Sequence, residues 1–322
     1  MLRASLALLI LAACGDDGGV RHLPDARPFD APPGIYVTNG NAVLVFDIAA
    51  RGNAAPIRAI SGASTGLDLP IGIDLDSDGL LYIANRNAGT VTIFPKDGSG
   101  NLAPMRTITG LGSAEGLAIT SSDDLFVSGC PSCGGSGGGT DTVYHVPHGA
   151  SAPDYTIEGA ATTITVPSSL AIDKSVDELY VANSFGGNVS VWTLDQRGDV
   201  APARSFEPNA SNLQSMTYSN GTVFIAQPSS GILMFDAHAT GTPAPMMMPF
   251  AAPLSVGYPG GMFLDQSGPD GQPVIYLADY TGNAIHIITT SGTAPNLAVA
   301  SVETIQGSMT QLASPLGIRV VP

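Results

Sequence analysis

Short apolar segments of four kinds recur along the chain in a fixed order. The most regular kind recurs as IYVTN (35–39), LYIAN (81–85), LFVSG (125–129), LYVAN (179–183), VFIAQ (223–227) and IYLAD (275–279). A segment with a small residue near its start precedes most copies, and an alternating segment such as TVTI (90–93) follows. The fourth kind begins after an Ala-Pro pair. Short runs of this kind between Gly- and Pro-rich turns are typical of β-strands.

The four segments fit four positions in a propeller blade. Small residues such as Gly72 and Ser169 allow backbones to approach closely where innermost strands converge on an axis. The second segment is apolar on both faces, as in a covered strand. The proline before the fourth segment suits an outer edge, where it discourages pairing with another chain. The sequence therefore predicts an all-β fold, a six-bladed β-propeller of four-stranded blades.

The two ends of the repeat series complement each other. The first repeat begins with a second-type segment at Ile35, and the chain stops after an unaccompanied first-type segment at 316–321. We expect these segments to share one blade, so that the C-terminal strand completes the N-terminal blade and closes the ring. The predicted propeller domain is 34–322, with about 48 residues per repeat, near the known periods of roughly 40–50 residues for four-stranded blades.

The N-terminal residues have the composition of an export signal. Arg3 precedes an apolar stretch that is too short to span a membrane. The stretch ends in LAAC (11–14), which resembles the bacterial lipobox. Residues 1–14 are therefore predicted to be a lipoprotein signal peptide with Cys14 as the lipidation site. The alternative is an ordinary signal peptide in which this cysteine is incidental.

Residues 15–33 are rich in Asp, Gly and Pro and have little apolar content. Such a segment cannot bury enough surface to fold, so it is predicted to be a disordered tether. Gly15 follows the lipobox cysteine. By resemblance to the enterobacterial sorting rule, a residue other than Asp there favours the outer membrane.

The charge of the chain limits its partners. Lys and Arg together number 12 and Asp and Glu 27, which gives a net charge of −15. This field repels a phosphate backbone, so we expect no nucleic-acid partner. We expect a monomer.

Two motifs resemble known propeller repeats. Residues 36–39 spell YVTN, the signature of the YVTN-type repeat, and GID (72–74) with LYIAN (81–85) resembles NHL repeats. The resemblance covers all of 34–322 and implies the propeller fold. It does not select a function, because these propellers host binding, scaffolding, lyase and lactonase activities.

One face of the propeller is the candidate ligand site. In β-propellers generally, the loops before the first strand and between the second and third strands share this face. The predicted ligand contacts are Asn39, Asn85, Glu115, Asn183, Gln214, Gln227 and Asp279, rimmed by Phe185, Tyr258 and Tyr280. The alternative is that Asn and Asp simply start the hairpin turns.

Few residues of the sequence support an enzymatic function. Gluconolactonase-type propellers hold a divalent metal near the axis, with a Glu before a Gly on a first strand, and Glu115-Gly116 matches this. The equivalent positions in the other repeats carry no carboxylate, whereas a hard cation usually needs more than one. No catalytic residue, metal or cofactor is therefore predicted. A divalent ion held by Glu115, Asp279 and amide oxygens is the remaining alternative.

Two further motifs have structural and chemical interpretations. Cys130 and Cys133 form a C-x-x-C pair in a Gly-rich loop, and we predict a local disulfide in an oxidising compartment. Metal or redox chemistry is the alternative. The DLDSDG run (74–79) resembles the start of a calcium loop, but Asn85 stands where the bidentate Glu is expected, so a hairpin turn is favoured.

Together these features favour a lipid-anchored binding or scaffold module of the bacterial cell envelope, with a protein or glycan partner. The alternative is a metal-dependent hydrolase or lyase, lactonase-like, centred on Glu115.

Overall fold

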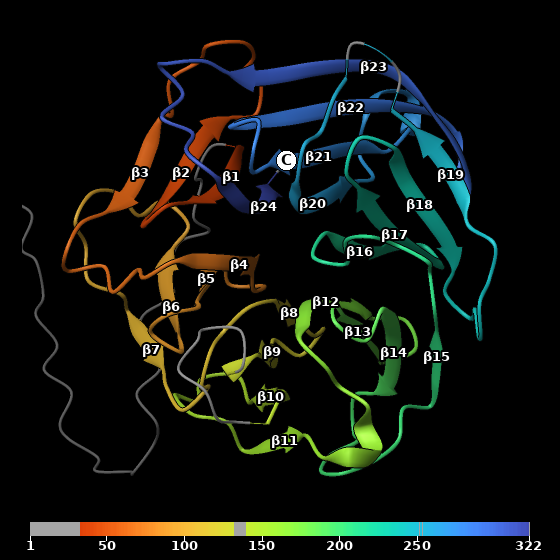
Figure 1. The fold of residues 1–322 in the computed structure, drawn as a ribbon. Helices are drawn as coiled ribbons and strands as arrows, with labels where there is room; N and C mark the ends of the chain where they lie inside the picture. Colours follow the sequence, from red (N-terminus) through yellow and green to blue (C-terminus); the bar gives the residue numbers. More distant parts are fainter. Residues whose placement is uncertain (1–32, 132–139, 251, 253, 322) are drawn as a thin grey trace, which may run out of the picture. The chain divides into compact units, whose positions relative to one another are not determined.

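The computed structural model describes residues 33–131, 140–250, 252 and 254–321. Six antiparallel sheets of four strands are arranged in a ring around an axis (Figure 1). The prediction of a six-bladed β-propeller is confirmed. The predictions for the signal peptide with Cys14, for most of the tether and for Cys133 fall outside the described residues.

The strands of each blade are given in order from the innermost to the outermost. Blade 1 contains β24 (Pro315–Val321), β1 (Gly34–Asn39), β2 (Ala42–Asp47) and β3 (Arg58–Ser61). Blade 2 contains β4 (Pro70–Leu75), β5 (Leu80–Asn85), β6 (Thr90–Pro95) and β7 (Arg106–Ile108). Blade 3 contains β8 (Leu117–Ile119), β9 (Leu125–Gly129), β10 (Thr142–Val146) and β11 (Tyr155–Ile157). Blade 4 contains β12 (Pro167–Asp173), β13 (Glu178–Asn183), β14 (Asn188–Thr193) and β15 (Arg204–Phe206). Blade 5 contains β16 (Met216–Ser219), β17 (Thr222–Gln227), β18 (Gly231–Asp236) and β19 (Met246–Pro249). Blade 6 contains β20 (Pro259–Asp265), β21 (Val274–Asp279), β22 (Ala284–Thr293) and β23 (Asn296–Gln306).

The helical content of the described ranges is small. The single-turn 3-10 helices η2 (Ala160–Thr162) and η3 (Pro269–Gly271) lie in connections between strands. Over the ranges stated above, no helix has the length and apolar character needed to cross a membrane.

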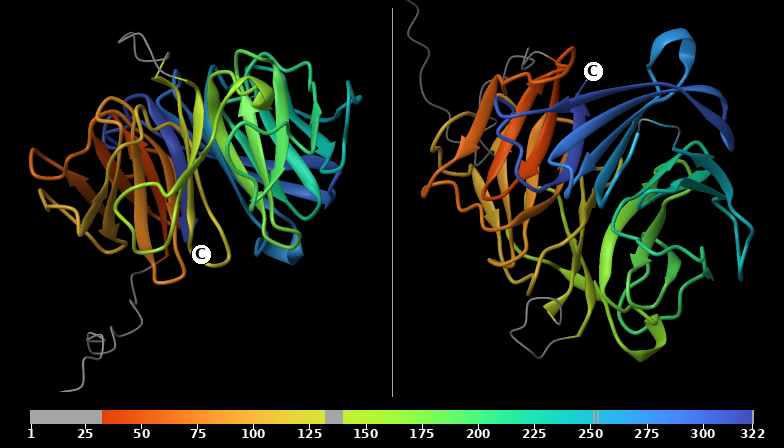
Figure 2. Two further views of the ribbon diagram at one scale, coloured as in Figure 1. Left: turned by 90° about the horizontal axis from the view of Figure 1, so that it is seen from below. Right: turned by 45° about the horizontal axis from the view of Figure 1, so that its top comes forward.

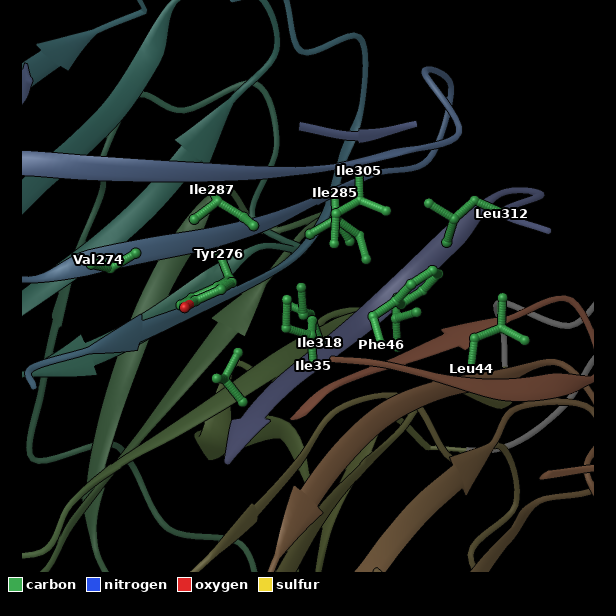
Figure 3. Packing of buried hydrophobic residues seen from close by; sticks show 13 residues of the cluster. Ile35, Leu44, Phe46, Val274, Tyr276, Ile285, Ile287, Ile305, Leu312 and Ile318 are labelled. Carbon is green, nitrogen blue, oxygen red and sulfur yellow. The ribbon is translucent and has the colours of Figure 1, made fainter. Parts of the chain in front are cut away.

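The two ends of the domain meet in blade 1, as the sequence predicted. The C-terminal strand β24 pairs antiparallel with β1, with Val37 opposite Ile318 and Gly34 opposite Val321. Ile318 and Val320 enter a core shared with blade 6, against Ile35 and its neighbours (Figure 3). The ring is therefore closed by backbone hydrogen bonds and by buried aliphatic side chains.

Innermost strands approach one another too closely for a side chain at the predicted small positions. A Cβ atom on Gly317 would overlap the carbonyl oxygen of Ile71 in the next blade. One on Gly72 would lie 2.6 Å from the carbonyl oxygen of Glu115. The close approach explains why small residues recur at this position.

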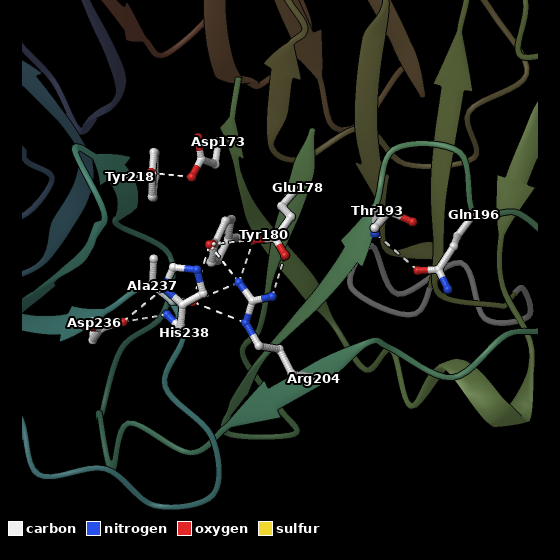
Figure 4. Close-up of polar contacts among 10 residues, drawn as sticks. All are labelled: Asp173, Glu178, Tyr180, Thr193, Gln196, Arg204, Tyr218, Asp236, Ala237 and His238. Atoms are coloured by element: carbon white, nitrogen blue, oxygen red, sulfur yellow. Dashed lines mark hydrogen bonds and ion pairs between the residues drawn. The ribbon is translucent and has the colours of Figure 1, made fainter. Parts of the chain in front are cut away.

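Inside three blades the outermost strand is tied to the second strand by an Arg–Tyr contact. In each contact Nη2 of the arginine donates a hydrogen bond to the phenolic oxygen of the tyrosine. The pairs are Arg58 and Tyr36 at 3.2 Å, Arg106 and Tyr82 at 3.0 Å, and Arg204 and Tyr180 at 2.9 Å. In blade 4 the same arginine also binds Glu178 in a bidentate pair (Figure 4). In all three blades this Arg stands two residues after the proline of the Ala-Pro pair, so its recurrence stabilises the blade.

Neighbouring blades are joined at their outer edges by a recurring clasp. A glycine between the third and fourth strands forms a parallel bridge with the outer strand of the preceding blade, as Gly100 does with Ile60. At three of these junctions the side chain of the next residue accepts a backbone N–H from the preceding blade. These contacts join Asn53 to Met309, Asn101 to Ser64 and Asp199 to Ala161, each at 2.7 Å.

Blades 5 and 6 are joined differently. The β22–β23 hairpin is longer than the hairpins of the other blades (Figure 2). Leu297 of this hairpin enters a core with Met248 of β19. Here apolar packing joins the outer parts of the two blades.

Candidate functional site

The first strands begin, and the second strands end, at the same side of the ring, which we call the upper face. The ladders establish this, because Pro70 pairs with Asn85, Pro167 with Asn183 and Pro259 with Asp279. The opposite side is the lower face. All seven predicted contacts are at the upper face or immediately beside an upper strand end.

Five of the predicted contacts end second strands and are buried. Each accepts a backbone N–H from the loop that leads into the innermost strand of its own blade. These hydrogen bonds come from Ala313 to Asn39, Asp68 to Asn85, Thr165 to Asn183, Ser211 to Gln227 and Tyr258 to Asp279. We call the five residues the loop locks. The contacts give them a positioning role, and their part in ligand contact stays a prediction.

Glu115, the sixth predicted contact, is buried and forms an ion pair. Its Oε1 lies 2.8 Å from Nε of Arg86, which comes from the β5–β6 turn of the neighbouring blade. Burial raises the pKa of Glu115, and the positive charge of Arg86 opposes this rise. The side chain of Arg86 remains 28% exposed, so the pair presents a partly accessible cation at the upper face.

Gln214, the seventh predicted contact, accepts a hydrogen bond from the hydroxyl of Tyr258, which joins blades 5 and 6. Tyr258 meets Tyr280 edge-on, with ring centroids 5.8 Å apart. Burial raises the pKa of Tyr258, Arg86 lowers it, and Tyr280 and Glu115 raise it further. These four side chains therefore share one electrostatic environment. On the rim, Phe185 is 82% exposed and Tyr280 39% exposed.

A channel of ≈ 270 Å³ runs along the innermost strands of all six blades. Gln214 and Ser168 line it towards the upper face, and Asp74, Lys174 and Arg319 line it towards the lower face. The channel is narrow where the small residues bring neighbouring backbones together.

The surroundings of Glu115 do not fit a divalent ion. The guanidinium of Arg86 is where a metal would approach the carboxylate. The Asp279 carboxylate accepts backbone N–H groups from Gly257, Tyr258 and Gly282. Within the described ranges no group of three or more His, Cys, Asp or Glu residues could hold a metal ion.

Asp279 is held as a carboxylate by its surroundings. Burial raises its pKa, but the hydrogen bond from His286 and those from the backbone N–H groups lower it well below its usual value. His286 lies on β22, the third strand of blade 6, with Nε2 3.5 Å from Asp279 Oδ2. The sequence did not predict this contact between a histidine and a loop lock.

Two other motifs can be compared with the structure. Asp76 accepts the N–H of Leu80 at 2.7 Å and its carbonyl accepts that of Gly79, which confirms the hairpin turn in the DLDSDG run. Cys130 is fully buried directly after β9. Its predicted partner Cys133 is outside the described residues, so the disulfide stays a prediction.

Comparison with known proteins gives the fold and no family. No protein-family model and no curated protein matches the sequence. Among solved structures, a chain of a nidogen/laminin complex is 13% identical with a TM-score of 0.60, over 89% of this chain and 98% of that one. A functionally unknown protein from Desulfotomaculum acetoxidans is 12% identical with a TM-score of 0.57, over 88% and 84%.

A third structure is a putative oxidoreductase (glucose dehydrogenase) from Thermus thermophilus. It is 15% identical with a TM-score of 0.53, over 81% of this chain and 90% of that one. All three share the overall fold with this chain. At such identities the similarity concerns the fold alone, and the YVTN and NHL character of the repeats stays a resemblance.

Proposed function

We propose that this chain is a lipid-anchored propeller of the bacterial cell envelope, in the outer membrane by the sorting rule, that binds a protein or glycan partner through its upper face. The lipobox and the polar segment after it support the anchoring. The cluster of Arg86, Glu115 and Tyr258 at the upper face, together with the exposed rings of Phe185 and Tyr280 on the same face, supports the binding.

The exposed rings carry the proposal. Phe185 and Tyr280 keep a large apolar surface in water, in the turns that directly follow the loop locks Asn183 and Asp279. Aromatic residues and Arg are enriched in binding interfaces, where a ring gives contact area at a small entropy cost. Each ring offers a surface for a sugar ring or an apolar side chain of a partner, and Arg86 offers a cation for an acidic or hydroxyl group.

The alternative is a hydrolase or lyase centred on Glu115. One observation favours it, since burial raises the pKa of this carboxyl as in many general acids. The Arg86 ion pair weighs against it, as does the finding that no metal-binding group of residues occurs in the part of the chain that the structure describes. The fold itself does not choose, because similar propellers occur in a protein complex and in a putative oxidoreductase.

A binding screen with matched variants tests the proposal. The full chain carrying Cys14→Ser, which removes the predicted lipidation site, is applied to a glycan array and to immobilised envelope proteins. Phe185→Ser should weaken a hit about tenfold or more, as for an interface hot spot. Val176→Ser removes another exposed apolar side chain, from the lower face, and should leave binding unchanged.

Three outcomes contradict the proposal. The first is the absence of any hit, and the second is a hit that Phe185→Ser and Arg86→Gln both leave intact. The third is lactone hydrolysis that disappears in Glu115→Gln, which would support the enzyme instead.

A further inference from the structure

One residue on each innermost strand takes an equivalent position towards the lower face. This position lies two residues after the small residue of the strand, as Asp74 follows Gly72. The strand ladders place it equivalently in every blade. The six residues, all lining the channel, are Asp74, Ala118, Ala171, Thr217, Phe263 and Arg319. They differ more in size and charge than any other equivalent set in the channel.

Three of these six side chains, Phe263, Arg319 and Asp74, contact one another in sequence and occupy one half of the channel. Their contacts extend across blades 6, 1, 2 and 3. The guanidinium of Arg319 lies over the ring of Phe263, 4.5 Å from its centroid. Arg319 Nε is 2.9 Å from Asp74 Oδ1, and Asp74 Oδ2 accepts the N–H of Ile119. Because the ion pair runs through Nε, the guanidinium can still present its two terminal nitrogens as a fork.

The other half is open, because Ala118, Ala171 and Thr217 are small. Lys174 and Tyr218 border this half. The Lys174 ammonium carries three donors and donates one long hydrogen bond, 3.4 Å to the carbonyl of Thr120. The neighbouring carboxylate of Asp173 accepts a hydrogen bond from Tyr218 (Figure 4). It also accepts the backbone N–H of Ser175.

The charge of the lining is opposite to that of the protein. Its charged residues are Asp74, Lys174 and Arg319, which give a net +1 in a chain of net charge −15. Charges in a narrow, partly buried channel act more strongly than on the surface. A cavity of ≈ 270 Å³ accommodates only a small molecule.

We propose that the open half of the channel binds a small monocarboxylate, held by the Lys174 ammonium and by the terminal nitrogens of Arg319. A planar carboxylate matches the guanidinium fork. A second negative charge on the ligand would face Asp74, so the site selects monoanions. This site is separate from the upper face and does not depend on the partner proposed there.

Isothermal titration calorimetry of the full chain carrying Cys14→Ser tests the site, with L-lactate as the probe and lactamide as its uncharged counterpart. Lactate should give a saturable heat that weakens as sodium chloride is added, and lactamide should give none. Absence of saturable lactate binding, equal binding of lactamide, or tighter binding of sulfate than of lactate would overturn the proposal.

Variants separate this site from a structural role of the ion pair. Lys174→Gln should weaken lactate about tenfold, the usual loss for a hydrogen bond to a charged group. Lys96→Gln, which changes the only other lysine, should leave the affinity unchanged. Asp74→Asn keeps the side-chain shape but removes the competing charge, so it should tighten binding. Equal binding in Lys174→Gln and the parent, or weaker binding in Asp74→Asn, would contradict the assignment.

Discussion

Removal of β24 should destabilise the whole domain. Deleting residues 315–322 takes away Ile318 and Val320, which are 6% and 1% exposed in the core between blades 1 and 6. A buried aliphatic side chain contributes roughly 1.5–3 kcal/mol, so the two contribute about 3–6 kcal/mol. The total free energy of unfolding of a domain is typically about 5–15 kcal/mol. The deletion also leaves the inner edge of β1 without its partner strand.

Urea and thermal unfolding of the deleted and parent chains measure this effect. We expect a large fall in the midpoint and aggregation through the exposed edge. The single change Ile318→Ala should cost about 2–5 kcal/mol, whereas Ile57→Ala, at an exposed isoleucine, should cost little. If the deleted chain unfolds at the same midpoint as the parent, ring closure by β24 does not stabilise the domain and our reasoning is wrong.

Three further predictions test other parts of the molecule. Asn101→Ala removes the acceptor for the Ser64 N–H and should cost about 1 kcal/mol in urea unfolding; no change would mean that the clasp is not stabilising. The hydrogen bonds from Arg204 lower the pKa of Glu178. Its stabilising contribution is therefore complete above the ordinary value of 4.5 and lost as pH falls through the lowered folded-state pKa. Unfolding measured between pH 7 and pH 2 should show a smaller acid loss in Glu178→Gln, and an unchanged profile would refute the assignment. Cys14→Ser should release the chain from membranes and alter its N-terminal mass, and unchanged partition with unchanged mass would count against lipidation.

The features that repeat in every blade could be predicted from the sequence. Gly317 and Gly72 recur because the same close backbone approach recurs, and Ile35 pairs with the last strand because each blade needs four strands. The Arg–Tyr contacts could also have been found, since both residues occupy fixed positions in several repeats. Arg106 and Tyr82 are one such pair.

The contacts that occur once could not be predicted in this way. Arg86 reaches Glu115 from a turn of the neighbouring blade, and no other repeat has an arginine at that position. The chain from Phe263 through Arg319 to Asp74 likewise depends on which unlike side chains the ring brings together. A repeat pattern predicts the environment that all blades share. It does not predict a contact that occurs in one blade only.

The loop locks have a consequence for the kinetics of recognition. Because buried amide and carboxylate oxygens already hold the loops that enter the innermost strands, the upper face has little conformational freedom to lose when a partner arrives. A surface ordered in advance associates without a slow rearrangement and keeps more of its contact energy as affinity. Association with a partner should therefore follow a single exponential, with an observed rate that rises linearly with partner concentration.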